Sequence, residues 1–316
     1  MTNTRLQTVH VDDFMAGGRS RDEFVRKLGQ ALEEVGFFAV EGHDITTDLV
    51  DEAYDKVQAF FSLPAEKKNE YYFSKVNGQR GFTPFGREHA KDSPAPDLKE
   101  FWQVGRPDVG PAHPVHQIFG PNVWPDELVP GYGAIMTEVY RRLDRLGALL
   151  LRACALHIEE DEERFSAMAV EGDTILRVIH YPPVAAGMEG SVRAAAHEDI
   201  NLITLLCAAT ASGLELLQHD GTWRAIETEG NQIVVDAGDM LQNVTNGLYK
   251  STTHRVVNPD DTTGARFSIP CFIHPRAEVD LTPLSSCVQR TGGEVKYPST
   301  SAGAYLRQRL AEIGLA

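Results

Sequence analysis

The sequence lacks the features of a membrane protein, a secreted protein or a nucleic-acid-binding protein. It contains no run of about 18 apolar residues, so no membrane-spanning helix is expected. Residues 1–14 have neither the basic start nor the apolar stretch of a secretory signal. No cluster of lysine and arginine offsets the formal net charge of -15, so a phosphate backbone has no evident binding surface. We expect a cytoplasmic protein with no membrane partner and no nucleic-acid partner.

Cysteine is scarce, and its spacing indicates neither a disulfide framework nor a thiolate metal site. No C-x-x-C motif occurs among Cys154, Cys207, Cys271 and Cys287. Free cysteine behaves as a small apolar residue and is often buried. We therefore expect these residues in the core, with no part in the chemistry.

The rest of the composition is typical of one compact domain. Of the 316 residues, 42% are hydrophobic and 24% are charged, which are ordinary values for a globular protein. Strand-rich folds often reach this length as one unit. We expect a single domain, 1–316, with a helical N-terminal region at 1–172, a strand-rich core at 173–280, and a C-terminal extension with a helix at 281–316.

Helical periodicity dominates the first half of the chain. Ser20 and Glu23 have the spacing of a capping box, and apolar residues recur at helical spacing from there to Gly36. The same reasoning predicts a short buried strand at 37–40 and two further helices at 48–61 and 132–157.

The segment between residues 70 and 130 has weak periodicity and many glycines and prolines, which is typical of loops. Long irregular segments in compact domains are often functional. Residues 77–106 are therefore either a cover over a binding pocket or a solvent-facing wrap.

The second half changes to short apolar or alternating runs separated by turn residues. The expected strands lie at 176–181, 202–207, 214–217, 233–235, 256–257 and 266–273. Short strands at this spacing indicate a sandwich or barrel, and a jelly roll is a natural container for a small-molecule pocket. We predict an α+β fold with a mainly β core, a double-stranded β-helix (jelly roll), flanked by N-terminal helices and by a final helix at 301–315.

The most informative residues are His197, Asp199 and His254. Residues i and i+2 of a strand face the same side, so His197 and Asp199 can both point inward, while Glu198 points out and away from the metal. A jelly roll can bring the strand-like run 250–258, which contains His254, alongside them. Two imidazoles and one carboxylate are the ligand set of a non-haem Fe(II) oxygenase, with coordination positions left open. Catalytic zinc uses the same set, so zinc is the competing metal.

Arg266 and Ser268, in a predicted strand, favour iron over zinc. A guanidinium can hold a carboxylate with two parallel hydrogen bonds, and Ser268 lies on the same strand face. An oxygenase must anchor an electron-donating oxo-acid beside its metal, whereas a zinc hydrolase needs no such arginine. In isolation the pair would more often be a strand-edge salt bridge with a satisfied hydroxyl. Its place after the H-x-D pair and the distant histidine favours the oxo-acid site.

Several motifs spread over nearly the whole chain occur together in one known family. They are Gly36-Phe37-Phe38 with Gly42-His43, Leu63-Pro64 followed by Lys67, Asp97-Leu98-Lys99-Glu100-Phe101-Trp102, Tyr181-Pro182-Pro183, His197-Glu198-Asp199, Asn246-Gly247-Leu248-Tyr249-Lys250-Ser251, His254-Arg255-Val256 and Arg266-Phe267-Ser268. In these motifs the chain resembles the 2-oxoglutarate and Fe(II)-dependent dioxygenases of the isopenicillin N synthase-like group.

The resemblance implies a role for each site residue. His197, Asp199 and His254 would bind Fe(II), while Arg266 and Ser268 would hold the distal carboxylate of 2-oxoglutarate. Tyr181 matches a tyrosine that also contacts this co-substrate, and its alternative role is a turn tyrosine packed before two prolines. O2 is the other co-substrate, and ascorbate is expected as a reductant. The implied reaction is the oxidation, by default the hydroxylation, of a small organic substrate with release of succinate and CO2.

Two positions depart from the family pattern. Glu198 stands where threonine is common, and Ile179 stands where asparagine is common. By strand alternation Glu198 should face away from the metal, so the triad is not threatened. Ile179 removes one polar contact and suggests a more apolar pocket wall.

Two other functions fit the same residues. An oxidase like isopenicillin N synthase uses this triad without 2-oxoglutarate, for ring closure or desaturation, and its R-x-S pair binds a substrate carboxylate. A non-catalytic small-molecule-binding module would keep the fold, although three buried ligands without a metal would need other partners. Candidate substrate contacts, which core packing or surface ion pairs explain as well, are Phe82, Phe85, Arg87, Gln103, Arg177 and Arg193.

Overall fold

The computed structural model describes residues 5–73, 75, 78–87, 97–110, 112–183, 193–257 and 264–312. In this part of the chain the strands form two sheets. The larger has the order β1-β2-β10-β7-β13-β5-β4-β3, with β12 also paired to β5, and its strands are β1 (Thr8–His10), β2 (Phe37–Glu41), β3 (Gly81–Thr83), β4 (Glu100–Val104), β5 (Ile175–Tyr181), β7 (Ile203–Leu206), β10 (Ile233–Ala237), β12 (Arg266–Ser268) and β13 (Pro270–Ile273). The smaller sheet has the order β6-β11-β8-β9, with β6 (Ala194–His197), β8 (Leu214–Leu217), β9 (Trp223–Ala225) and β11 (His254–Val256).

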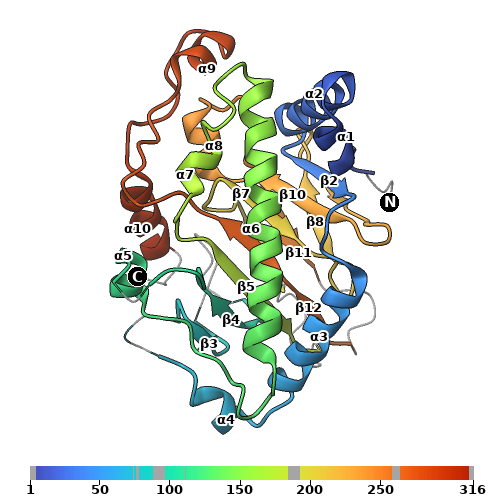
Figure 1. Ribbon diagram of the computed structural model, residues 1–316, viewed down its shortest axis with the longest axis vertical. Helices are drawn as coiled ribbons and strands as arrows, with labels where there is room; N and C mark the ends of the chain where they lie inside the picture. The colour runs from blue at the N-terminus through green and yellow to red at the C-terminus, as the bar shows by residue number, and fades with distance from the viewer. Residues whose placement is uncertain are drawn as a thin grey trace.

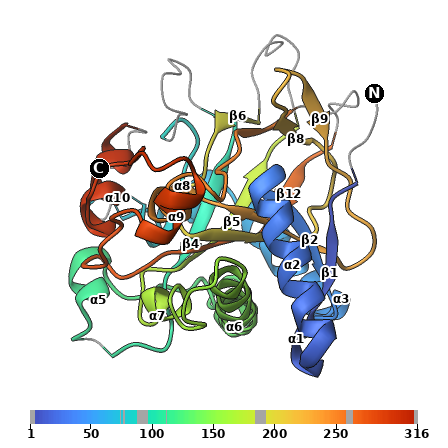
Figure 2. The ribbon, with the colours of Figure 1, turned by 90° about the horizontal axis from the view of Figure 1, so that it is seen from above.

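Helices cover the outer face of the larger sheet. Figure 1 shows the long α6 lying across this sheet, and Figure 2 shows α6 and α7 on one side of β4 and β5, with β6, β8 and β9 on the other. The helices are α1 (Val11–Ala16), α2 (Gly18–Glu34), α3 (Thr47–Phe61), α4 (Ala65–Asn69), α5 (Pro114–Phe119), α6 (Tyr132–His157), α7 (Ser166–Ala169), α8 (Asp239–Val244), α9 (Ser285–Arg290) and α10 (Ala302–Glu312). The molecule is therefore layered as helices, larger sheet and smaller sheet.

The helix α6 is the scaffold of the first layer because its apolar residues repeat every three or four positions. The residues of this stripe are buried, among them Ile135, Val139, Leu143, Leu146 and Leu150. They pack against β7 and β13 and against the helices α2 and α3. Burial of each such side chain stabilises the fold by about 1.5–3 kcal/mol. The contact of α6 with β7 and β13 therefore stabilises the larger sheet, which carries much of the cavity wall.

The predicted fold class, α+β with a jelly-roll core, is confirmed. The predicted helix at 132–157 and the predicted strand at 214–217 coincide with α6 and β8. The predicted final helix corresponds to α10, and residues 313–316 lie outside the described part. The predicted division of the single domain at residues 172 and 280 remains a prediction. The strands β1–β4, from the N-terminal region, belong to the larger sheet.

The capping box predicted at Ser20 and Glu23 is wrong. The helix α2 begins at Gly18 with Gly17 as its N-cap, so Ser20 already lies inside the helix. Gly17 and Gly18 have positive φ angles of 72° and 54°, which let the chain turn from the unpredicted α1 into α2.

The loop-rich segment contains regular structure that its sequence did not indicate. The strands β3 and β4 extend the larger sheet, and α5 follows them. Within the predicted cover at 77–106, residues 77 and 88–96 lie outside the described part of the chain. Its described residues form a wall of the cavity, through Gln79, Asp97, Lys99 and Gln103.

Two further expectations concern the whole chain. All four cysteines are buried and unpaired, as expected. In the described part of the chain, no helix has both the length and the apolar composition that a membrane crossing requires.

Candidate functional site

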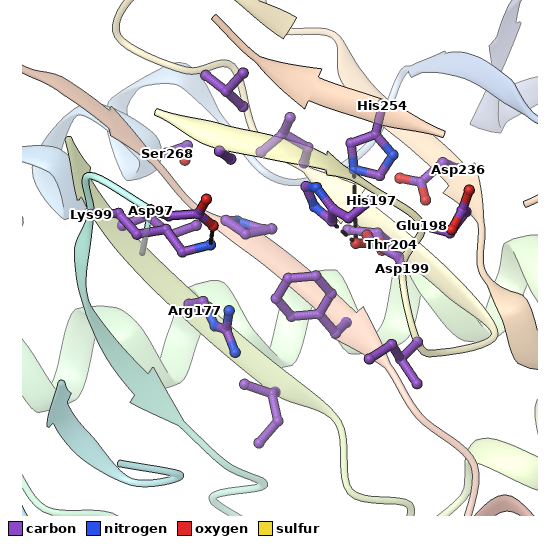
Figure 3. Close-up of a pocket in the computed structure, with 18 of the residues that line it drawn as sticks. Asp97, Lys99, Arg177, His197, Glu198, Asp199, Thr204, Asp236, His254 and Ser268 are labelled. Carbon is purple, nitrogen blue, oxygen red and sulfur yellow. Dashed lines mark hydrogen bonds and ion pairs between the residues drawn. The ribbon is translucent and has the colours of Figure 1, made fainter. Parts of the chain in front are cut away.

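The candidate site is a cavity of about 460 Å³ lined by residues of both sheets, which is a suitable size for a small molecule. Two groups of polar side chains line it. We call His197, Asp199 and His254 the triad, and we call Arg266, Ser268 and Tyr181 the arginine cluster. Figure 3 shows the triad side chains converging from two neighbouring strands and the loop that follows one of them, with Ser268, Arg177 and the Asp97–Lys99 pair around the same space.

The two histidines of the triad are brought together by strand pairing. The strand β6 ends at His197 and β11 begins at His254, and the antiparallel register puts these residues opposite each other. Nε2 of each histidine lies 3.8 Å from Oδ1 of Asp199. One potential ligand atom from each residue lies within 4.8 Å of the other two. Three atoms at these separations are close enough to bind one metal ion.

Both imidazoles are oriented through their second nitrogen. Nδ1 of His197 lies 2.7 Å from the carbonyl oxygen of Ala195, and Nδ1 of His254 lies 3.1 Å from that of Thr252. A carbonyl can only accept, so each Nδ1 carries the proton and each Nε2 is left with its lone pair. A metal-binding histidine is usually held in this way.

The carboxylate of Asp199 is also fixed in place. Asp199 is buried, and the hydroxyl of Thr204 donates to its Oδ2. Nδ2 of Asn201 in turn donates to the hydroxyl oxygen of Thr204 over 2.8 Å. The hydroxyl is thereby oriented, and Oδ1 is the oxygen that faces the two histidines.

The electrostatics of the triad keep His197 suitable for a metal. Burial, and next the neighbouring His254, lower the pKa of His197 to about 4. His197 is therefore neutral at pH 7, and a metal requires a neutral imidazole. Burial, and next the charge of Asp199, hold the pKa of Asp236 on β10 well above its usual range. The carboxyl of Asp236 is therefore held in its protonated form more readily than an ordinary aspartate.

The strand alternation expected for the H-x-D pair does not continue to Asp199, because β6 ends at His197. Glu198 lines the cavity instead of pointing out of the core, and its carboxylate accepts a hydrogen bond from the hydroxyl of Thr253. Since Thr253 precedes His254, this bond joins the two segments that carry the triad. Glu198 is not part of the cluster of potential metal ligands.

The arginine cluster is built on two paired strands. Arg266 lies opposite Tyr181 and Ser268 lies opposite Ile179, and all four residues are buried on the cavity wall. The guanidinium carbon of Arg266 lies 5.1 Å from the centre of the Tyr181 ring, and its Nε donates to the carbonyl of Ala211 over 3.0 Å. Among the described residues, Nη1 of Arg266 has no hydrogen-bond partner. A buried guanidinium with an unused donor is suited to an anionic ligand.

Two of the six predicted substrate contacts line the cavity. They are Gln103 and Arg177. The guanidinium carbon of Arg177 lies 4.4 Å from the ring centre of Phe101 and 5.3 Å from that of Phe272. Its Nη2 lies 3.4 Å from Oε1 of Gln103. Arg177 is thus a cation held between two aromatic rings at the cavity wall.

The other four predicted contacts lie away from the described lining of the cavity. Phe82 is buried in the core, where it packs against Phe60 and Phe61. Phe85 is 44% exposed, and Arg87 lies over the ring of Tyr72. Arg193 is buried next to β6, and its Nη2 donates to the carbonyl of Gly264 over 2.7 Å.

The structure also reveals cavity residues that the sequence did not single out as site residues. Asp97 and Lys99 form a buried ion pair of 2.8 Å on the cavity wall, and Oδ1 of Asp97 accepts a hydrogen bond of 3.1 Å from the backbone of Ala195. Because Ala195 belongs to β6, the pair fixes the strand that carries His197. The sequence signal that could have indicated this ion pair is the placement of opposite charges, Asp97 and Lys99, on either side of one leucine.

The C-terminal helix α10 also contributes to the cavity, through Leu306, Arg309 and Leu310. Asp239 anchors this helix: its carboxylate accepts a hydrogen bond from Tyr305 over 3.0 Å and pairs with Arg309 at 3.2 Å. The backbone N–H of the same Asp239 donates to the carbonyl of Asp199 over 2.8 Å. One residue therefore connects the helix to the triad.

The chain matches two family models that together span most of its length. Residues 172–275 match the 2OG-Fe(II) oxygenase superfamily, and residues 8–127 match the N-terminal region of the non-haem dioxygenases described from morphine synthesis. Both the triad and the arginine cluster fall within the first of these matches.

Individual relatives agree with the family models. A proline hydroxylase of Petromyces alliaceus is 31% identical, over 97% of this chain and 99% of the relative. A putative 2OG-Fe(II) oxygenase family protein from Caulobacter crescentus is 36% identical and has a TM-score of 0.87, with 98% of this chain and 99% of the other covered. A full-length Neurospora crassa protein, solved in complex with α-KG and thymine, is 30% identical with a TM-score of 0.84, and the likeness covers 96% of each chain.

Proposed function

This chain belongs to the 2-oxoglutarate and Fe(II)-dependent oxygenase superfamily, and we propose that His197, Asp199 and His254 hold its ferrous ion. The observation that carries the proposal is the convergence of one potential ligand atom from each residue within 4.8 Å. Two imidazoles and one carboxylate fit ferrous iron and leave coordination positions open. The engagement of both Nδ1 atoms by backbone carbonyls supports Nε2 as the binding atom of each histidine.

The protein is an enzyme whose co-substrate is 2-oxoglutarate, and we propose that the arginine cluster holds the distal carboxylate of this molecule. Arg266 is buried, and one of its donors has no partner in the described part of the chain. Ser268 lies on the same strand face and offers a hydroxyl. Tyr181 lies opposite Arg266 and forms the third side of the site. A charged, hydrogen-bonded carboxylate would satisfy these groups together.

Iron and 2-oxoglutarate, when bound, supply the dioxygen chemistry, and the protein supplies position and exclusion of water. Thr204 and the carbonyls of Ala195 and Thr252 hold the triad before any ligand binds. Arg266 and Ser268 orient the co-substrate toward the triad. The substrate then occupies the remaining cavity, and hydroxylation of one of its C–H bonds is the reaction we propose.

We propose a small organic substrate that offers a carbonyl or carboxylate oxygen to Arg177. This guanidinium lines the cavity between two aromatic rings, and Gln103 orients it. Thymine, the molecule bound to the Neurospora crassa protein, and proline, the substrate named for the Petromyces alliaceus relative, both carry such an oxygen. The net charge of -15 supports a small molecule over nucleic acid as the partner.

Two finer assignments complete the proposal. We infer a cytoplasmic location, because four buried cysteines without a disulfide are typical of a reducing compartment. We also infer that the chain lies in the isopenicillin N synthase-like group, on the motifs from Gly36 to Ser268.

The test is the fate of 2-oxoglutarate in the purified protein. With Fe(II), O2 and ascorbate, we expect succinate to be released slowly without substrate, and faster when thymine, proline or another suitable compound binds. Oxygen consumption with a substrate but without succinate would instead indicate an oxidase. Neither oxygen consumption nor succinate under any condition would indicate a binding module.

A further inference from the structure

The C-terminal helix α10 presents one face to the cavity that contains the triad. Its residues Leu306, Arg309 and Leu310 line this cavity. They are spaced i, i+3 and i+4, so they lie on the same side of the helix. Figure 1 and Figure 2 both show α10 beside α5 at the edge of the molecule. The helix therefore forms a wall between the cavity and the outside of the protein.

The side-chain packing of α10 is weak along most of its length. Its buried residues are Ala302 and Gly303, both in its first turn. Their backbone N–H groups each donate a hydrogen bond of 2.8 Å to a carbonyl within residues 277–279. Leu306 and Leu310, which face the cavity, are half-buried. A helix with few buried side chains opens locally at a low free energy, so the later turns of α10 need another attachment.

Asp239 supplies this attachment. Its buried carboxylate accepts a hydrogen bond of 3.0 Å from the hydroxyl of Tyr305 and forms an ion pair of 3.2 Å with Arg309. Tyr305 and Arg309 are spaced i and i+4, so one carboxylate holds two successive turns of α10. Hydrogen bonds to a charged group are roughly twice as strong as those between neutral groups. Loss of the carboxylate should therefore release the helix where it borders the cavity.

Asp239 is itself fixed relative to the triad. Its backbone N–H donates to the carbonyl of Asp199 over 2.8 Å. A Cβ atom on the preceding Gly238 would lie 2.2 Å from Oδ1 of Asn201 and 2.8 Å from the carbonyl oxygen of Asp199, so the two backbone segments are in close contact. Tightly packed segments of this kind transmit a displacement. The position of α10 is accordingly set relative to Asp199.

We propose that Asp239 is a positioning residue that holds α10 against the cavity and thereby limits the rate at which molecules reach and leave the triad. The role rests on the proposed function, in which the triad holds Fe(II). Asp239 is not among the described residues that line the cavity. A closed wall slows entry and exit to the same extent and leaves the affinity at equilibrium unchanged. A disturbance of the triad itself would change the affinity.

The test compares Asp239→Asn and Tyr305→Phe with the wild-type protein. Asp239→Asn keeps the shape of the side chain but removes its charge, and Tyr305→Phe removes the hydrogen bond from the side of the helix. In Asp239→Asn we expect the backbone amides of α10 to exchange with solvent about 10- to 100-fold faster, with a smaller increase in Tyr305→Phe. A chelator should remove Fe(II) from the anaerobic protein faster by a similar factor. The dissociation constant for Fe(II) and the amide exchange of α6 should stay at the wild-type values.

Arg307→Gln is the matched control, because Arg307 is an exposed residue of the same helix. We expect wild-type amide exchange and wild-type Fe(II) removal in this variant. Unchanged exchange of α10 in both test variants would overturn the inference, as would faster exchange without faster removal of Fe(II). A raised dissociation constant for Fe(II) would also overturn it, since Asp239 would then act on the triad directly. If the wild-type protein bound no Fe(II), the proposed function would fail, while amide exchange would still show whether Asp239 holds α10.

Discussion

The triad and the arginine cluster differ in how completely their polar atoms are satisfied by the protein. Nδ1 of both histidines and Oδ2 of Asp199 already have partners, so the remaining atoms of the triad point at one place. Arg266 instead keeps one buried N–H donor, Nη1, without a described partner. The protein itself holds the first group in place, whereas in the proposed function the second group is completed by the carboxylate of 2-oxoglutarate.

This difference has a physical consequence for each group. An unsatisfied buried donor destabilises the protein by about 1–3 kcal/mol, more when it is charged. Bound anion should therefore stabilise the fold through the arginine cluster, while the triad needs little rearrangement to accept a metal. The predictions below test this contrast in order of decreasing effect on ligand binding.

Removal of one triad ligand should have the largest effect. In His254→Ala we expect loss of bound Fe(II) and of succinate release, because two remaining ligands do not hold the ion in the fixed geometry. Iron content after anaerobic reconstitution and succinate formation are the measurements. His219→Ala, which changes an exposed histidine of the same sheet region, should keep both. Full iron content in His254→Ala would show that the metal is bound elsewhere.

Loss of the guanidinium in Arg266→Gln should affect the co-substrate but not the metal. Truncation of one partner of a buried charge pair weakens binding by about 2–5 kcal/mol, so we expect the dissociation constant for 2-oxoglutarate to rise about 30-fold or more. Fe(II) content should stay at the wild-type value, since Arg266 is not among the clustered metal ligands. Calorimetry of the anaerobic Fe(II) protein gives both quantities. A joint loss of Fe(II) and 2-oxoglutarate would mean that the two groups are not separable.

The hydroxyl of Thr204 tests whether the satisfied partners of the triad matter. Thr204→Val keeps the shape of the side chain but removes the donor to Oδ2 of Asp199. Partners of metal ligands typically contribute about 10- to 100-fold to metal affinity, and we expect a loss of that size. Thr204→Ser should keep most of the affinity because it retains the hydroxyl. Competition with a metal chelator measures the change, and equal affinities for Val and Ser variants would contradict this account.

The same contrast explains what the sequence could predict. The triad could be predicted because its residues form a sequence pattern, an H-x-D pair and a histidine in a later strand. The structure pairs His197 with His254 as this pattern requires. The unused donor of Arg266 follows from its burial between strands, and no spacing in the sequence indicates it. Asp97 reaches Ala195 across nearly 100 residues for the same reason. Contacts of this kind depend on the packed fold and not on a local pattern.

Regular structure shows the same division between local and distant causes. The stripe of α6 is periodic, so the sequence predicts it from end to end. The strand β6 reads Ala-Ala-Ala-His, and alanine has little preference for strands, so the sequence indicated a strand here only through the H-x-D pair that begins at its last residue. It forms because it pairs with β11 and because Asp97 binds its backbone. The strand that carries His197 thus depends on tertiary contacts.

The last prediction involves no ligand and concerns the pH dependence of the stability of the metal-free protein. The pKa of His197 is about 4 in the folded state, against about 6.5 in an unfolded chain. Between these pH values the unfolded chain binds a proton at His197 and the folded protein does not, so the free energy of unfolding should decrease as the pH falls from 6.5 to 4. His197→Gln lacks this proton uptake, and its stability should decrease less steeply over the same range. Urea unfolding of both chelator-treated proteins at several pH values measures the difference, and parallel curves would show that the imidazole of His197 is not buried in its neutral form.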